Sequence, residues 1–206
     1  DNFDDAQKEA QKQINDNTIF IHPFDDITVI EGQGTIALEI LDQIDKHFDY
    51  LIIPIGGGGL ISGIITVFNK LSPKTKIIGV EAEGAPAMFT SLDQKKIIEL
   101  NKIDNFVDGV SIKKIGKIPF EICKEHLDDL LVIPEGKICQ TILDLYNKDG
   151  IVVEPAGAIG ISAFELNHEK FTNKNVGILI CGGNNDIIRM SEIKERALLF
   201  SKLKHY

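Results

Sequence analysis

The stretch Asp49-Tyr-Leu-Ile-Ile-Pro-Ile-Gly-Gly-Gly-Gly-Leu-Ile-Ser-Gly63 decides how this 206-residue chain is built. Its apolar run, residues 51–55, has the length and the β-branched content of a fully buried strand. Four glycines follow at 56–59, and residues 60–71 have the pattern of a helix. Glycines let successive N–H groups converge on one anion, and a helix start adds free N–H groups and the positive end of its dipole. The stretch therefore predicts a phosphate-binding loop between a strand and a helix.

Two common phosphate-binding patterns do not fit this loop. The P-loop pattern needs Lys-Ser/Thr after its last glycine, but Ile64 and Ile65 follow Gly63. The dinucleotide pattern G-x-G-x-x-G fits no register of residues 56–63. A glycine turn without a ligand is one alternative, and the entropy cost of four glycines argues against it. A membrane span over the uncharged residues 50–69 is another, and Pro54 and the glycines argue against it.

Composition narrows the class of protein and its partners. The chain is 43% hydrophobic and 26% charged, as in ordinary globular proteins. Its net charge of −9 argues against nucleic acid and anionic membranes as partners. The three cysteines are widely spaced, and the histidines show no zinc-binding spacing. We therefore expect a cytoplasmic protein without disulfides, signal peptide or membrane helix.

Short apolar segments alternate with helical patterns along the rest of the chain, which predicts an α/β fold with a mostly parallel sheet. Both glycine turns, 56–59 and 182–183, follow expected core strands, so they should share one crevice at the carboxyl ends of the strands. We expect strands at 18–22, 50–55, 76–80, 130–133 and 176–181, and a short strand or extended piece at 151–153. We expect helices at 1–15, 60–71, 85–92, 120–126, 138–147 and 187–202, one opening at 154–158, and one that begins at Thr35 as N-cap and buries Ile36, Ile40 and Ile44. Residues 93–118 should be loops.

Two segments together resemble the fold-type II family of pyridoxal phosphate enzymes: Ile-Pro-Ile-Gly-Gly-Gly-Gly-Leu at 53–60 and Cys-Gly-Gly-Asn at 181–184. Within that family, four more resemble the threonine dehydratases: His-Pro-Phe-Asp at 22–25, Gly-Gln-Gly-Thr at 32–35, Asp-Gly-Val at 108–110 and Glu-Pro-Ala-Gly at 154–157. The tail at 195–205 resembles the biosynthetic branch. The resemblance implies a three-layer αβα fold of the tryptophan synthase β type, of which this chain would be a large-domain portion.

The resemblance also implies an activity and a cofactor. Members of this kind are homo-oligomeric threonine ammonia-lyases of isoleucine, hence branched-chain amino-acid, biosynthesis. They use pyridoxal 5′-phosphate to dehydrate and deaminate L-threonine to 2-oxobutanoate and ammonia. A serine dehydratase or racemase acting on L-serine is the alternative within the class.

Carried over to this sequence, the resemblance implies a set of cofactor-binding residues. Gly56, Gly57, Gly58, Gly59 and the Leu60 amide would hold the phosphate, Gly109 and Glu154 would lie beside the ring, and Cys181 would face the pyridine nitrogen. Each of the last three has a plain structural alternative. Gly109 could form an ordinary turn, Glu154 could be a helix-start carboxylate, and Cys181 could be a buried strand-end thiol. Glu81 matches one ligand of a cation site found in some relatives, but residues 85–87 lack the second acid, so we expect no metal.

One essential part of the family pattern is missing. The Ser-Phe-Lys-x-Arg-Gly motif that carries the Schiff-base lysine is absent, as is the asparagine loop for the substrate carboxylate. No catalytic residue is therefore assigned, and we expect residues 1–206 to be a single α/β domain, an incomplete part of a longer catalytic region that is inactive alone. Two other classes stay open: a noncatalytic domain that binds a phosphate ligand, and a structural subunit that completes a split enzyme with a lysine-bearing chain.

Overall fold

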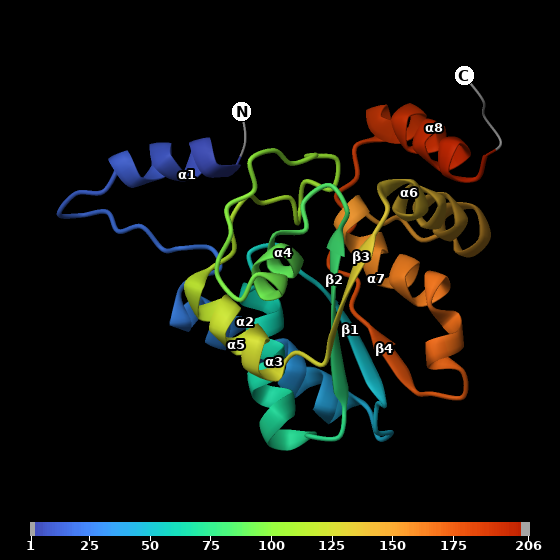
Figure 1. Cartoon of the computed structure of the whole chain (residues 1–206), viewed down its shortest axis with the longest axis horizontal. Coiled ribbons are helices and arrows are strands. Elements are labelled where there is room, and N and C mark those ends of the chain that lie inside the picture. Colours follow the sequence, from blue (N-terminus) through green and yellow to red (C-terminus); the bar gives the residue numbers. More distant parts are fainter. Residues whose placement is uncertain (1–2, 203–206) are drawn as a thin grey trace.

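A computed structural model, which describes residues 3–202, shows a four-stranded parallel sheet with the order β3-β2-β1-β4 (Figure 1). The strands are β1 (Tyr50–Pro54), β2 (Lys76–Ala82), β3 (Asp129–Ile133) and β4 (Val176–Ile178). Tyr50 lies opposite Lys76 on one side of β1 and opposite Val176 on the other. The predicted α/β class and parallel sheet are confirmed.

Helices connect the strands and cover both faces of the sheet (Figure 1). One face packs against α2 (Ile27–Gln43), α3 (Gly59–Leu71), α4 (Ala87–Asp93) and α5 (Lys117–His126). The other packs against α6 (Glu135–Asp144), α7 (Pro155–Leu166) and α8 (Met190–Phe200). The remaining helix, α1 (Phe3–Lys12), precedes α2. The three-layer αβα architecture is therefore present.

Successive side chains of the buried strands point to opposite faces of the sheet, so the core consists of two clusters. Leu51 and Ile53 of β1 pack with α3, whereas Ile52 between them packs with α7 on the opposite face. All three side chains are buried, with at most 2% of their surface exposed. Because helices cover both faces, the strand needs apolar residues on both sides, which explains its continuous apolar run.

The predicted start of the helix at Thr35 is wrong, because the N-cap of α2 lies nine residues earlier. Asp26 is its N-cap, and the Asp26 carboxylate accepts hydrogen bonds from the backbone N–H groups of Thr28 (2.8 Å) and Val29 (3.2 Å). Its buried residues are Ile30, Gly34 and Ala37, and the predicted stripe of Ile36, Ile40 and Ile44 is partly or largely exposed.

The glycines of the Gly32–Thr35 segment therefore lie within a helix. A Cβ on Gly63 of α3 would lie 2.5 Å from the Gly34 backbone nitrogen and 2.4 Å from the Ile30 carbonyl oxygen. Only glycine at position 63 permits this close contact between α2 and α3. The contact fixes the start of α3, where the glycine loop ends.

Other boundaries differ from the sequence expectations. The predicted strand at 18–22 is absent: Asn15 and Thr18 form one isolated bridge, and the chain then runs without regular structure to the turn before α2. β4 ends at Ile178, three residues before Cys181, and residues 151–153 have no regular secondary structure. A π-helical turn, Leu145–Asp149, follows α6, and a 3-10 turn, Ile187–Arg189, precedes α8. The predicted first helix lies partly outside the described residues, which begin within it.

Candidate cofactor-binding site

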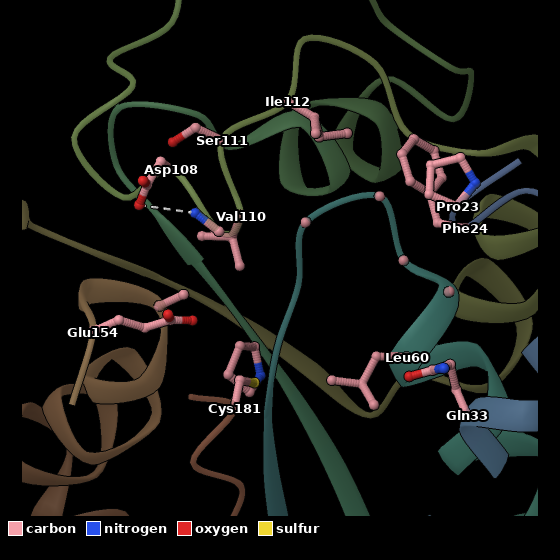
Figure 2. Close-up of a pocket in the computed structure, with 17 residues that line it drawn as sticks. Pro23, Phe24, Gln33, Leu60, Asp108, Val110, Ser111, Ile112, Glu154 and Cys181 are labelled. Atoms are coloured by element: carbon pink, nitrogen blue, oxygen red, sulfur yellow. Dashed lines mark hydrogen bonds between the residues drawn. The ribbon is translucent and has the colours of Figure 1, made fainter. Parts of the chain in front are cut away.

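A pocket of about 380 Å³ opens at the carboxyl ends of the central strands (Figure 2). It is the crevice expected for a parallel α/β sheet. The glycine loop after β1, the 108–112 segment, the start of α7 and Cys181 after β4 all contribute to its wall. The lining residues are Pro23, Phe24, Gln33, Pro54, Gly56, Gly57, Gly58, Gly59, Leu60, Asp108, Gly109, Val110, Ser111, Ile112, Glu154, Ala156 and Cys181.

The glycine loop, which lines this pocket, has a row of unpaired backbone donors. Within residues 3–202, no hydrogen bond uses the backbone N–H groups of residues 56–60. Gly58, the N-cap of α3, has a φ of 92°, a left-handed conformation that favours glycine. Two hydrogen bonds to loop carbonyls fix its backbone. The Gly57 carbonyl accepts from the Gly116 N–H (3.2 Å), and the Gly58 carbonyl accepts from the Ser62 hydroxyl (2.6 Å). Unpaired N–H groups at a helix N-terminus are suited to bind an anion such as a phosphate.

Residues ahead of α2 close one end of the glycine loop. A Cβ on Gly57 would lie 2.1 Å from the Phe24 ring, so this aromatic side chain packs directly against the loop backbone. The His22 ring meets the Phe24 ring edge-on at 4.6 Å, and its Nδ1 accepts from the Asp25 N–H at 3.0 Å. His22 therefore has a structural role, since it supports Phe24. Phe24 and Gln33 also line the pocket, although no sequence motif assigns them to it.

Glu154 and Gly109 lie on the opposite wall of the pocket. A Cβ on Gly109 would lie 2.9 Å from the Ala156 Cβ and 3.4 Å from the Glu154 carboxylate. Glu154 is the N-cap of α7, but its carboxylate makes no capping hydrogen bond. It lies instead against Gly182, where a Cβ would be 2.8 Å from Glu154 Oε1. Glu154 therefore lies at a helix start, as its plain structural alternative states, and its carboxylate also lies along the pocket wall (Figure 2).

Cys181 lies at the pocket wall with its side chain exposed. The alternative of a buried strand-end cysteine is wrong, because β4 ends before this residue. Desolvation by the surrounding protein and the negative charge of Glu154 raise the pKa of the Cys181 thiol to about 11. The thiol is therefore neutral at physiological pH. Cys181 and the first glycine loop share this pocket, whereas Gly182 and Gly183 of the second glycine turn, which we expected in the same crevice, are not among its lining residues.

Asn185 orders the second glycine turn. The Asn185 amide donates to the Val153 carbonyl (3.2 Å), and its backbone N–H donates to the Gly183 carbonyl (2.9 Å). The Glu154 N–H also donates to Gly182 O (3.1 Å). These bonds join the turn after β4 to the start of α7, and so place Cys181 beside Glu154.

Glu81 serves a helix end. Its carboxylate, 1% exposed at the end of β2, accepts from the N–H groups of Met88 (2.8 Å) and Phe89 (2.7 Å) at the start of α4. Burial raises the pKa of Glu81 to about 8, although the two backbone hydrogen bonds oppose the shift. In residues 3–202, no group of three or more His, Cys, Asp or Glu side chains is placed to hold a metal. None of the described helices has the length and hydropathy of a membrane span.

The fold and the glycine loop define a class of protein. Residues 1–182 match the family described as pyridoxal-phosphate dependent enzymes, and the chain belongs to this family. The "L-threonine dehydratase biosynthetic IlvA" of Halalkalibacterium halodurans is 53% identical over 207 residues, which cover 100% of this chain and 50% of the relative. The chain thus spans about half the length of the curated relatives that it matches.

Two solved structures extend the likeness to three dimensions. The processed form of threonine deaminase isoform 2 from Solanum lycopersicum has a TM-score of 0.84 and 36% identity, over 92% of this chain and 55% of that one. Maize serine racemase has a TM-score of 0.79 and 30% identity, over 93% of this chain and 60% of that one. The predicted resemblance to threonine dehydratases and the fold-type II architecture are confirmed.

Proposed function

We propose that this chain supplies the phosphate cradle and one ring wall of a pyridoxal-phosphate-dependent L-threonine dehydratase. The reaction converts L-threonine to 2-oxobutanoate and ammonia. The observation that carries the proposal is the row of unpaired N–H groups from Gly56 to Leu60 at the pocket. A phosphate monoester has the charge and the acceptor oxygens that such a row requires.

The residues present fit this cofactor. Gly56, Gly57, Gly58, Gly59 and the Leu60 N–H would hold the phosphate. The ring would then extend from the loop toward Gly109, Glu154 and Cys181, which line the opposite wall of the same pocket. At Gly109, a side chain would meet Ala156 and narrow the space for the ring. Glycine therefore keeps this wall flat.

In this proposal the chain would bind the cofactor, orient it and control whether its pyridine nitrogen carries a proton. When bound, pyridoxal 5′-phosphate withdraws electrons from the α-carbon of an amino acid. Cys181 would face the pyridine nitrogen with a neutral thiol, since its pKa of about 11 keeps it protonated. Such a neutral thiol would donate no full proton to the ring, so Cys181 would leave the pyridine nitrogen largely unprotonated. Glu154 raises the thiol pKa and thereby supports this state.

The base that removes the α-proton is not among the described pocket residues, because no lysine from residues 3–202 lines the pocket. We propose that this lysine belongs to the half of the relatives' length that the chain does not span. Residues 1–206 would then form one α/β unit of a longer catalytic region. A small amino acid is the proposed substrate, and homo-oligomeric assembly and a cytoplasmic location stay predictions.

A chimera tests this proposal. The part of the Halalkalibacterium halodurans relative that precedes its match to this chain is joined to residues 1–206, and production of 2-oxobutanoate from L-threonine is measured. We expect turnover in the chimera and none in residues 1–206 alone. Gly57→Ala in the cradle should abolish turnover, and Gly32→Ala, whose Cβ meets nothing within 4 Å, should leave it unchanged.

The same assay separates the alternatives. The likeness to maize serine racemase favours L-serine as a second candidate substrate. If the chimera produces pyruvate or D-serine from L-serine faster than 2-oxobutanoate from L-threonine, L-serine is the preferred substrate. Cofactor binding without turnover of either amino acid in a folded chimera would favour the noncatalytic binding domain.

A further inference from the structure

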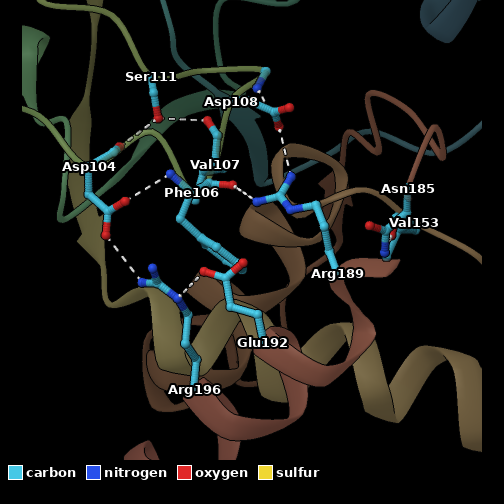
Figure 3. A network of polar contacts seen from close by, with 11 residues as sticks. Asp104, Phe106, Val107, Asp108, Ser111, Val153, Asn185, Arg189, Glu192 and Arg196 are labelled. Atoms are coloured by element: carbon cyan, nitrogen blue, oxygen red, sulfur yellow. Dashed lines mark hydrogen bonds and ion pairs between the residues drawn. The ribbon is translucent and has the colours of Figure 1, made fainter. Parts of the chain in front are cut away.

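Two arginines of α8 and the turn before it hold the loop that forms one pocket wall (Figure 3). Arg189 and Arg196 are the only arginines in the chain, beside twenty lysines. Both guanidinium groups lie over the ring of Phe106, at 4.9 Å and 4.2 Å from its centroid. Phe106 is 4% exposed and lies two residues before Asp108, the first residue of the wall segment 108–112.

Arg189 contacts the loop next to the pocket. Its Nη2 donates to the Phe106 carbonyl at 2.6 Å, and its Nη1 pairs with the Asp108 carboxylate at 3.6 Å. Asp108 lines the pocket, and its carboxylate also accepts from the Gly109 N–H at 3.2 Å. The guanidinium thus connects the end of the 3-10 turn to the residue beside Gly109.

Arg196 contacts the start of the same loop. Its Nη1 donates to the Asp104 carboxylate (3.1 Å), and its Nε donates to Glu192 of α8 (2.9 Å). Burial disfavours the charge on Arg196, but the hydrogen bonds and charges of Asp104 and Glu192 outweigh burial and raise its pKa. The two cations can therefore share one aromatic ring, because each has its own carboxylate partner.

The loop between these contacts is internally cross-linked. The Phe106 N–H donates to the Asp104 carboxylate at 2.9 Å, and the Ser111 hydroxyl donates to the carbonyls of Asp104 (3.0 Å) and Val107 (2.8 Å). The Val110 N–H closes the turn on Val107 at 3.0 Å. A displacement of Phe106 would therefore move the whole segment, Gly109 and Val110 included.

We propose that Arg189 and Arg196 are positioning residues that fix the wall segment 108–112 to the C-terminal helix and so set the affinity of the pocket for the cofactor. This inference rests on the proposed function. The position of α8 would then affect the pocket, since any contact that shifts α8 would also move Phe106 and with it the pocket wall. A purely stabilising role would instead lower the stability of the whole domain without a specific effect at the pocket wall.

Amide hydrogen exchange, read residue by residue on the full 206-residue chain, tests the inference without the cofactor. Arg189→Gln and Arg196→Gln each remove one cation of this pair. Lys194→Gln is the matched control, because Lys194 is exposed on α8 and no ion pair within residues 3–202 uses it. We expect exchange of the Val110 amide to rise about tenfold in the arginine variants, with the buried amides of β1 and β2 unchanged, and no change in Lys194→Gln.

Binding of pyridoxine 5′-phosphate by calorimetry supplies the second readout, because this compound has no aldehyde to react with surface lysines. We expect about threefold to tenfold weaker binding in Arg189→Gln and Arg196→Gln, and partial rescue in Arg189→Lys, which keeps the charge beside Asp108. If the unchanged protein binds no pyridoxine phosphate, the proposed cofactor site fails, and Val110 exchange still decides the inference. Unchanged Val110 exchange in both arginine variants would overturn it.

Should an arginine variant unfold, Asp104→Asn decides the question from the loop side. This change removes the ion pair with Arg196 but keeps an oxygen that can accept from the Phe106 N–H. Faster exchange confined to the 106–111 segment supports the inference. Exchange that rises equally in the sheet and in this segment would show a general loss of stability and would overturn it.

Discussion

The Phe24 ring packs so closely against Gly57 that a Cβ at position 57 would lie 2.1 Å from the ring. The backbone of Phe24 is similarly close to Gly59, where a Cβ would lie 2.9 Å from the Phe24 Cα. The glycine loop therefore has the pocket on one side and is tightly packed against Phe24, in the segment before α2, on the other. This contact and the hydrogen bonds to the Gly57 and Gly58 carbonyls fix the loop backbone at the pocket wall.

Gly57→Ala should destabilise the domain and disrupt the cradle. The added methyl group can be accommodated only if Phe24 or the loop moves, and overpacking of this kind costs about 1–3 kcal/mol. The free energy of unfolding, measured by urea denaturation, should fall by that amount. Gly32→Ala, in the middle of α2 with an open Cβ position, should instead raise it by about 0.5–1 kcal/mol.

A double-mutant cycle tests whether the contact with Phe24 causes the loss of stability in Gly57→Ala. Phe24→Ala removes the ring atoms that a Cβ at position 57 would meet, so Gly57→Ala should cost much less in that background. Additive effects of the two changes would show that the cost comes from loop conformation rather than from Phe24.

Cys181 should be the single reactive thiol of the folded chain. Cys123 and Cys139 are buried, and burial raises the pKa of each to about 12. Alkylation by iodoacetamide should therefore modify Cys181 alone, and its rate should rise with pH up to about 11, since only the thiolate reacts. Cys181→Ser should abolish the reaction. A reaction rate that is already maximal at pH 8 would contradict the raised pKa.

Glu81 should make stability depend on pH. In the folded chain its pKa is raised from 4.5 to about 8, so between these values the folded carboxyl holds a proton that the unfolded one has lost. The free energy of unfolding should therefore fall as pH rises across this range, by up to about 1.4 kcal/mol per pH unit from this group. Glu81→Gln should lower stability, because its amide cannot accept from both Met88 and Phe89, and should remove this slope. Equal slopes in the two proteins would contradict the assignment.

Periodicity and apolar runs were sufficient to predict the core of the fold. The buried run of β1 and the helical pattern of α3 appear in the structure within a residue or two of their expected bounds. The start of α2 was missed because two glycines at 32 and 34 are typical of a turn. A tertiary contact instead explains the glycine at position 34, because α2 and α3 approach too closely for side chains at positions 34 and 63. The weak alternation at 18–22 has no neighbouring strand to pair with.

The site was predicted where it depends on local sequence. The glycine loop, Gly109, Glu154 and Cys181 do line one pocket. Phe24, Gln33 and the two arginines could not be found in this way, because their roles come from contacts across distant segments. Phe24 precedes the glycine loop by more than thirty positions, and Arg189 contacts Phe106 from 83 positions away. A pair of arginines among many lysines was the only sequence signal for the latter contact.

The most direct test of the central claim is a nuclear magnetic resonance titration of the isotope-labelled chain with pyridoxine 5′-phosphate, with unphosphorylated pyridoxine as the control. The backbone amides of Gly56, Gly57, Gly58, Gly59 and Leu60 should shift with the phosphorylated compound and not with the control, because their free N–H groups bind the phosphate. Unchanged amide signals for this loop at saturating ligand, or equal shifts with both compounds, would contradict the account.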